Sequence, residues 1–255
     1  MAKSALEWLQ NARSVMDQIE ETQMPNIEKA AVMMADSIEK GHWVHTFGCG
    51  HSTLPVEEMY PRIGGFVGFH PMIELPLSYF THIHGDMGVH QFLFLERAEG
   101  YGKEIMKSHN FKPEDTMWLF SHSGINNVII DVALRAKELG MNLVVCGSEK
   151  AFAEKESRHS SGKKVFEIAD VVVDSCVPAV DATVNLKNHS DKVGPVSTMA
   201  FTSLVWLIIT TVAEILDERG EKLFIHPSHN VPGDTTAHER LSAAVAEYKR
   251  RIAGV

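Results

Sequence analysis

Two short polar turns carry the residues best placed to bind a ligand: residues 48–52 (GCGHS) and residues 121–124 (SHSG). Each turn follows an apolar run and precedes a helical pattern, so its backbone N–H groups lie at a helix N-terminus, where anions bind. The second turn offers hydroxyls and no charge, which suits an anion that binds and is released. The alternative for Ser121 and Ser123 is that they only cap the following helix.

Several of the fourteen histidines lie in polar loops and could carry protons, because imidazole changes charge near neutral pH. His84 and His229 are the leading candidates, since glycine or proline bounds their loops. The spacings His82-x-His84 and His226/His229 could also chelate a metal, but no shared acidic ligand is evident. We therefore expect neither a metal nor another cofactor.

The composition excludes several classes of protein. The chain has 255 residues, of which 44% are hydrophobic, enough for a sizeable core, and its net charge is -9. An acidic chain has no basic face to neutralise phosphates, so nucleic acid is not expected as a partner. The three cysteines show no metal-binding or redox spacing, and the N-terminus shows no apolar signal segment. We therefore expect free thiols in a cytoplasmic protein.

No charged side chain lies between Lys192 and Glu214, a length that would nearly span a bilayer. Serine and threonine are spread through this segment, and no basic flank marks a cytoplasmic side. We expect a buried helix at the centre of a domain or at a subunit interface, and no membrane partner. An apolar helix of this kind also predicts a homodimer or a higher even-numbered oligomer.

The elements that must position the polar turns alternate between strand and helix. Strands are expected at residues 42–47, 66–69, 116–120, 143–148 and 169–174, and helices at 6–21, 27–40, 52–60, 96–109, 128–139, 196–216 and up to 252. Pro25 is expected to separate the first two helices. Parallel strands need helical crossovers, so a doubly wound α/β fold is predicted, with ligands beyond the carboxyl ends of the strands. The two turns and a third, at residues 147–148, converge on that edge.

The pattern GxGxS after the first strand, SxSG after a later strand and a hydroxyl after the fourth resembles a sugar isomerase (SIS) domain. This is the fold of phosphoheptose isomerase, N-acetylmuramic acid 6-phosphate etherase and the isomerase half of glucosamine-6-phosphate synthase. The resemblance covers roughly residues 27–220, and residues 221–255 form a loop and helix extension of one domain, 1–255. It implies a three-layer α-β-α sandwich around a five-stranded parallel sheet with flavodoxin-like winding, preceded by N-terminal helices. The chain also resembles uncharacterised SIS proteins that share the stretches EEMYPRIGG and SRHSSGKK.

The resemblance implies which residues bind substrate. Hydroxyls of the SxSG turn hold the phosphate in the family, and the serine of GxGxS makes a second contact. Asn126 stands where phosphoheptose isomerase has a further serine; the amide still donates a hydrogen bond, and a sulfonate would fit the same donors as a phosphate. The residues expected to bind substrate are Gly48, Gly50, His51, Ser52, Ser121, His122, Ser123, Asn126 and Ser148.

Three glutamates are candidates for acid–base chemistry: Glu58 is expected to be the general acid or base, with Glu96 or Glu99 as its companion. Moving a proton next to a sugar carbonyl requires a base near the substrate, with its pKa raised by partial burial. The stretch from Glu58 to Pro61 resembles the Glu-Cys-Pro-Pro stretch of the etherase, and the stretch from Glu96 to Glu99 resembles a second glutamate-bearing stretch of that enzyme. In sugar isomerases of this fold a histidine can open the ring, often from a neighbouring subunit.

These features predict a protein that binds an anionic sugar, phosphorylated or sulfonated, and isomerises it between aldose and ketose. Two alternatives stay open: an etherase-like lyase acting on a sugar phosphate, and a non-catalytic regulatory protein that senses one. Two glutamates and a histidine within proton-transfer distance of the SHSG turn would favour an enzyme.

Overall fold

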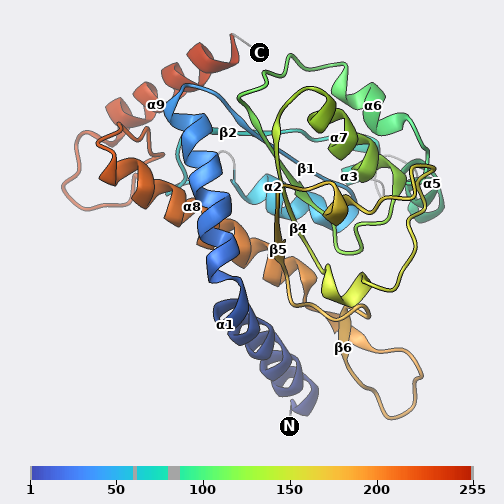
Figure 1. The fold of residues 1–255 in the computed structure, drawn as a ribbon. Helices are drawn as coiled ribbons and strands as arrows, with labels where there is room; N and C mark the ends of the chain where they lie inside the picture. Colours follow the sequence, from blue (N-terminus) through green and yellow to red (C-terminus); the bar gives the residue numbers. More distant parts are fainter. Residues whose placement is uncertain (1, 60–61, 80–86, 254–255) are drawn as a thin grey trace.

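The fold is organised around one parallel sheet, in the strand order β2-β1-β3-β4-β5 (Figure 1). The computed structural model describes residues 2–59, 62–79 and 87–253. The strands of this sheet are β1 (Val44–Gly48), β2 (Phe69–Pro71), β3 (Thr116–Phe120), β4 (Asn142–Gly147) and β5 (Val171–Asp174). The neighbouring strands β1 and β3 are paired so that Val44 lies opposite Thr116 and Gly48 lies opposite Phe120. The carboxyl ends of these two strands are therefore level. This confirms the predicted five-stranded parallel sheet.

Helices cover both faces of the sheet. The longer helices are α1 (Lys3–Glu39), α7 (Asn127–Glu138), α8 (Ser197–Glu218) and α9 (Ala237–Ile252), and the shorter ones include α2 (Leu54–Met59), α3 (Leu75–Ser78), α5 (Val89–Leu95) and α6 (Tyr101–Met106). Alternate residues of β3 face opposite sides: Trp118 packs in the core that α1 and α8 share, whereas Leu119 packs in the core that α7 shares. Strands buried on both faces are typical of parallel sheets with helical crossovers. The predicted three-layer α-β-α sandwich is confirmed.

One long helix, α1, replaces the two predicted N-terminal helices. Pro25 lies inside it, where a proline removes one backbone hydrogen bond. Apolar residues on both sides of the proline, such as Ile19 and Ile27, are fully buried, so packing holds the helix continuous. Next to the proline, the buried Gln23 accepts a hydrogen bond from the backbone N–H of Asp174 at 2.9 Å. The prediction of a break at Pro25 was therefore wrong, because tertiary contacts outweigh the local cost.

The predicted helix 96–109 was also wrong in its extent. Helix α5 ends at Leu95, directly before Glu96, and α6 begins only at Tyr101. Gly100 has φ +91°, a left-handed conformation that breaks an α-helix and that glycine adopts readily. Glu96 and Glu99 consequently lie on a tight turn between two short helices.

Helix α8, which carries no charged side chain before Glu214, lies in the core, as predicted. By length and composition it is the one described helix that could cross a membrane, but one side of it is buried against α1 and α2. Its first turn is capped by Asp181, whose carboxylate accepts hydrogen bonds from the N–H groups of Val196 and Ser197, both at 2.8 Å. A two-stranded hairpin, β6 (Ala182–Val184) and β7 (Val193–Pro195), leads from Asp181 into the helix and was not predicted.

The extension after α8 packs on the edge of the sheet near β2. Its loop pairs with the segment before β2 through a bridge between Ile225 and Phe66. Helix α9 contributes Ala244 and Tyr248 to a small cluster with Trp43, whose ring lies 5.1 Å from that of Tyr248. The extension therefore covers the end of the sheet from which β1 starts.

A group of buried histidines lies at the amino end of β1, on the edge of the sheet opposite the polar turns. His45 is fully buried; its Nδ1 lies 3.0 Å from Nδ1 of His70, and its Nε2 lies 3.2 Å from a carboxylate oxygen of Asp115. Burial lowers the pKa of His70 to about 4, and the neighbouring His45 and His109 lower it further. Burial also lowers the pKa of His109. The rings of His70 and His109 are thus held neutral in the fold.

We expect this cluster to make the fold sensitive to mild acid. In the unfolded chain His70 takes up a proton near pH 6.5, whereas in the folded chain it stays neutral down to about pH 4. Between these pH values the unfolded state binds the extra proton, so the free energy of unfolding falls as the pH falls, by up to about 1.4 kcal/mol per pH unit for one proton. Urea unfolding of His70→Asn should give a shallower pH dependence from 6.5 to 4 than the natural chain. The exposed His238→Asn serves as the control; equal slopes for all three chains would contradict the prediction.

Candidate functional site

A cavity of about 180 Å³ opens at the carboxyl ends of β1 and β3. Both predicted turns reach it, as does the turn between α5 and α6. Its lining consists of Cys49, Ser52, Glu96, Phe120, Ser121, His122, Ser123, Asn126 and Ile129. Five predicted substrate-binding residues and one predicted catalytic glutamate are therefore brought together, at the edge of a doubly wound sheet where ligands bind.

The first turn is shaped by two glycines. A Cβ on Gly48 would lie 2.1 Å from the backbone oxygen of Ser52, and one on Gly50, which has φ +60°, would lie 2.7 Å from the ring of Phe92. Only residues without a side chain allow the chain to fold back this tightly after β1. The tight turn directs Ser52 to the cavity, while His51 is exposed and does not line it.

The second turn presents two hydroxyls. Ser121 Oγ accepts a hydrogen bond from the N–H of Gly124 at 3.1 Å, which leaves its own O–H free to donate to a ligand. Gly124 has φ +68°, and a Cβ there would lie 2.4 Å from the ring of Phe166. The turn is therefore fixed by its backbone, and Ser121 and Ser123 face the cavity at the start of α7.

His122 belongs to a chain of hydrogen bonds that leads away from the cavity. Burial lowers the pKa of His122, so the ring is neutral and one of its nitrogens carries hydrogen. Its Nε2 lies 3.5 Å from the carbonyl oxygen of Ala179, which can only accept, so Nδ1 accepts from Ser148 Oγ at 3.1 Å. Ser148 Oγ lies 2.7 Å from Ser175 Oγ and is fully buried. The structure thus places Ser148 behind His122 and outside the cavity lining.

Glu96 is the acidic group of the cavity. Its side chain is 8% exposed, and one of its oxygens accepts a hydrogen bond from the amide of Asn126 at 2.8 Å. Its backbone oxygen accepts from the N–H of Val128, in the first turn of α7, at 3.2 Å. Burial raises the pKa of Glu96, and Arg97, Arg158 and the Asn126 amide oppose that rise. A buried carboxyl with a raised pKa is a candidate for proton transfer to and from a substrate.

The other two predicted glutamates make contacts outside the cavity lining. Glu58, on α2, accepts a hydrogen bond from Trp206 Nε1 at 3.1 Å and forms an ion pair with Arg62 at 2.9 Å. Glu99 is exposed and accepts hydrogen bonds from the N–H and the hydroxyl of Ser160, which lower its pKa. Catalytic roles for Glu58 and Glu99 stay predictions.

The two predicted histidines do not line the cavity. His84 lies outside the described residues, as does His82. His229 is exposed in the loop between α8 and α9, on the opposite side of the molecule from α5 (Figure 1). Among the residues that the structure describes, no group of three His, Cys, Asp or Glu side chains is arranged to hold a metal ion.

Cys49, Phe120 and Ile129 line the cavity but were not predicted to do so. Their positions in or next to the two turns are the signal that could have indicated them. Burial raises the pKa of the Cys49 thiol, and the neighbouring Glu96 raises it further. Cys49 therefore stays protonated and contributes an apolar wall instead of a nucleophile.

A larger groove of about 600 Å³ lies between α1 and the β6–β7 hairpin, and Lys150, Lys192 and Asp174 are among its lining residues. It lacks the hydroxyl turns, and both oxygens of its buried carboxylate, Asp174, accept hydrogen bonds from the backbone N–H groups of Lys150 and Cys176. Chemistry depends on convergent donors and a group with a shifted pKa rather than on volume. The smaller cavity is therefore the candidate site.

Comparison with known proteins shows the family to which the chain belongs. The family described as SIS domain matches residues 7–148. A UPF0309 protein of Shouchella clausii (strain KSM-K16) is 32% identical over 232 residues, which cover 90% of this chain and 89% of that protein. A UPF0309 protein of Thermoanaerobacter pseudethanolicus is 31% identical over 251 residues, covering 97% of this chain and 98% of that protein.

A solved structure of a phosphoheptose isomerase from Francisella tularensis has a similar fold, with a TM-score of 0.50 and 15% identity. The similarity covers 82% of this chain and 96% of that chain. At this identity the likeness concerns the fold alone. The match to the family spans more than half of the chain, and the two relatives extend along most of it. The chain therefore belongs to the SIS domain family, among the UPF0309 proteins.

Proposed function

We propose that the chain binds an anionic sugar, phosphorylated or sulfonated, in the 180 Å³ cavity and isomerises it between aldose and ketose. The observation that carries the proposal is the presence of a buried carboxyl, Glu96, in the same cavity as the hydroxyls of Ser52, Ser121 and Ser123. A site of this kind can hold a sugar by its anion and move a proton at a carbon further along the chain.

The hydroxyl turn is suited to the anion. Ser121 and Ser123 lie at the N-terminus of α7, a helix of 12 residues whose dipole and free N–H groups favour negative charge. Anion binding would then position the reacting carbon, since energy from a remote group can be used to orient the reacting one.

Glu96 is suited to the proton transfer. In an aldose–ketose isomerisation, a base takes the proton from C2 while the carbonyl oxygen on C1 gains a proton, which gives an enediol. The base then returns its proton to C1 while the hydroxyl on C2 loses its proton and becomes the ketone oxygen, so that the base ends each turnover unchanged. Burial raises the pKa of Glu96, which increases its strength as a base. Its hydrogen bond from Asn126 holds one oxygen and leaves the other for the substrate.

The first test concerns anion binding. Replacing Ser121 and Ser123 together by alanine removes two hydroxyl donors, so the affinity for a sugar phosphate should fall by about a hundredfold, at roughly 1.5 kcal/mol for each hydrogen bond to a charged group. Calorimetric titration with fructose 6-phosphate and related sugars measures this. A double variant that binds as tightly as the natural chain would show that the anion lies elsewhere.

The second test concerns the base. Glu96→Gln keeps the shape of the side chain and its bond to Asn126 but removes the basicity, so turnover should fall by about two to four orders of magnitude while anion affinity is retained. Proton exchange in heavy water, measured over a panel of phosphorylated and sulfonated sugars, follows the reaction. Glu58→Gln is the matched comparison, because Glu58 is the other glutamate predicted from the sequence.

The outcomes separate the candidates. Loss of exchange in Glu96→Gln alone supports the proposal, whereas loss in Glu58→Gln alone assigns the base to Glu58. Binding without exchange of any sugar, in the natural chain, would indicate a sensor instead of an enzyme.

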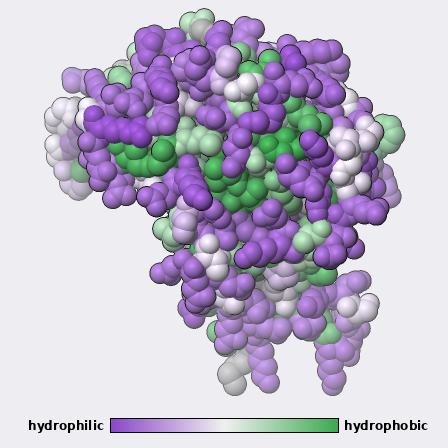
Figure 2. All heavy atoms as spheres, viewed as in Figure 1, coloured by the Kyte–Doolittle hydropathy of each residue, from purple (hydrophilic) through white to green (hydrophobic). Residues whose placement is uncertain are grey.

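The proposal includes self-association, as a homodimer or a higher even-numbered oligomer. The N-terminal half of α1 extends beyond the body of the molecule beside the β6–β7 hairpin (Figure 1). Its surface is mostly hydrophilic (Figure 2), yet Leu6 and Leu9 on it and Val193 on the hairpin are exposed. Exposed apolar residues on extended elements are typical of surfaces that pack against another chain. A neighbouring chain could also supply the histidine that opens the sugar ring, for which His229 is the described candidate.

We expect light scattering at micromolar concentration to give the mass of a dimer or a tetramer. Leu6→Asp together with Leu9→Asp should shift the distribution toward the monomer, because charges in an apolar contact are not compensated. Leu54→Asp, at another exposed apolar position, is the control. A monomeric natural chain would contradict the prediction.

A further inference from the structure

The loop at residues 157–163, part of the SRHSSGKK stretch, reaches the candidate site without lining it. Arg158 lies on this loop, and its guanidinium donates a hydrogen bond to Oδ1 of Asn126. Asn126 is the residue before α7; it lines the cavity, and its amide nitrogen donates to Glu96. The guanidinium of Arg158 is therefore connected to the carboxyl of Glu96 through the side-chain amide of Asn126.

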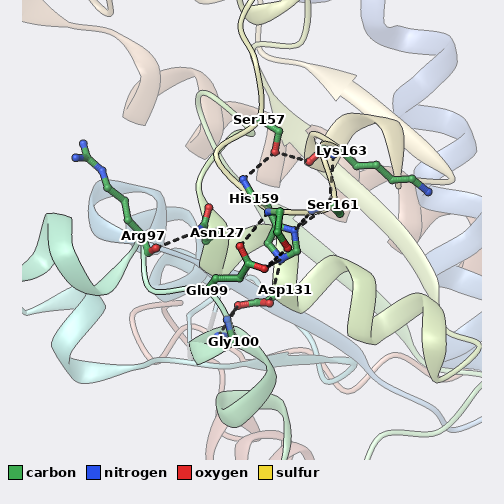
Figure 3. A network of polar contacts seen from close by, with 11 residues as sticks. Arg97, Glu99, Gly100, Asn127, Asp131, Ser157, His159, Ser161 and Lys163 are labelled. Carbon is green, nitrogen blue, oxygen red and sulfur yellow. Dashed lines mark hydrogen bonds and ion pairs between the residues drawn. The ribbon is translucent and has the colours of Figure 1, made fainter.

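The loop is held in place by the buried His159. Backbone N–H of Ser161 donates to Nδ1 of His159 at 3.0 Å, so the ring hydrogen is on Nε2, which donates to Asp131 at 3.3 Å (Figure 3). Asp131 is fully buried in α7. The two ends of the loop are also joined, since Ser157 Oγ donates to the backbone oxygen of Lys163 at 2.8 Å.

Glu99 provides a second connection, from the turn that carries Glu96. It accepts from the backbone N–H of Ser160 at 2.9 Å and also from the Ser160 hydroxyl. The N–H of Arg158 itself donates to the backbone oxygen of Ile125 at 3.0 Å. The backbone of Arg158 is thus fixed on both sides, and its long side chain is left exposed at the mouth of the site.

The negative charge of the cavity suggests a role for the nearby guanidinium of Arg158. Among the described residues that line the cavity, Glu96 has the one charged side chain. An ionised carboxylate there repels an anionic substrate, and hydroxyls alone do not offset a full charge. A guanidinium can, because its planar fork of N–H groups binds two oxygens of a phosphate or sulfonate at once.

We propose that Arg158 is a substrate-binding residue that selects for the anionic group: its guanidinium leaves Asn126 and binds the phosphate or sulfonate oxygens that Ser121 and Ser123 hold from the other side. The inference rests on the proposed function of the same cavity. The 157–163 loop holds the backbone of Arg158 in place before the substrate arrives, so that only the side chain moves.

Inorganic phosphate is the probe, titrated calorimetrically into the full chain, with inorganic sulfate as a second anion. Arg158→Gln should weaken phosphate binding about ten- to a hundredfold, the scale of a charge-assisted hydrogen-bond pair. Arg158→Lys should weaken it less, because an ammonium keeps the charge but loses the paired geometry. Both variants alter an exposed side chain, so the fold is not at risk.

Arg97→Gln is the matched control. Arg97 is an exposed arginine next to Glu96, and its side chain points away from the cluster in Figure 3. Arg97→Gln removes one positive charge, as Arg158→Gln does, but it leaves Arg158 in place. The loss of general electrostatic attraction alone should keep the phosphate affinity within about threefold of that of the natural chain.

The results distinguish this inference from the function on which it rests. A natural chain that binds neither phosphate, sulfate nor any sugar phosphate overturns both. Loss of binding in the Ser121 and Ser123 double variant, with natural affinity in Arg158→Gln, overturns the role of Arg158 and leaves the anion site standing. Equal losses in Arg158→Gln and Arg97→Gln also overturn it, because a nonspecific charge effect then suffices.

Discussion

The buried carboxylate of Asp131 joins three segments that must be in register for the site to exist. One oxygen accepts from the N–H groups of Gly100 and Gly102, at 2.6 and 3.3 Å, and the other accepts from the ring of His159. A fully buried charge is tolerated only when donors surround it, and removing it would leave those donors unpaired in turn. Asp131 therefore couples the positions of three segments: loss of its carboxylate would displace the turn carrying Glu96, helix α7 behind the SHSG turn and the 157–163 loop. Figure 3 shows how closely they meet.

This arrangement separates two tasks within one small cavity. The hydroxyls come from a turn fixed by the backbone of β3 and α7, whereas the carboxyl comes from a turn fixed by Gly100 and Asp131. The carboxyl of Glu96 is in addition held by the hydrogen bond from the side-chain amide of Asn126. Preorganised donors need little rearrangement when a substrate binds, which is the condition under which electrostatic contributions to catalysis are largest.

The sheet and both polar turns could be predicted because local patterns determine them: buried apolar runs end in glycine and serine, and helices follow. Glu96 could be named as a candidate but not placed, since its position depends on a left-handed Gly100 that ends one helix and begins another. The stretch that contains Arg158 could be singled out from the sequence, but Arg158 could not be placed at the site, because its contact with Asn126 joins residues 32 positions apart in the chain. At Pro25 the local pattern predicted a break that does not exist, since buried contacts along α1 keep the helix continuous across the proline.

Gly102 has a consequence for how the family can diverge. A Cβ at this position would lie 2.4 Å from the backbone oxygen of Val128, so α6 and α7 touch through their main chains. Contacts between main chains persist while side chains are exchanged during evolution. The close packing of α6 on α7 thus also fixes the spacing between the turn that carries the carboxyl and the hydroxyl turn. A larger residue at position 102 would push the two helices apart and so widen the distance between the carboxyl of Glu96 and the hydroxyl turn.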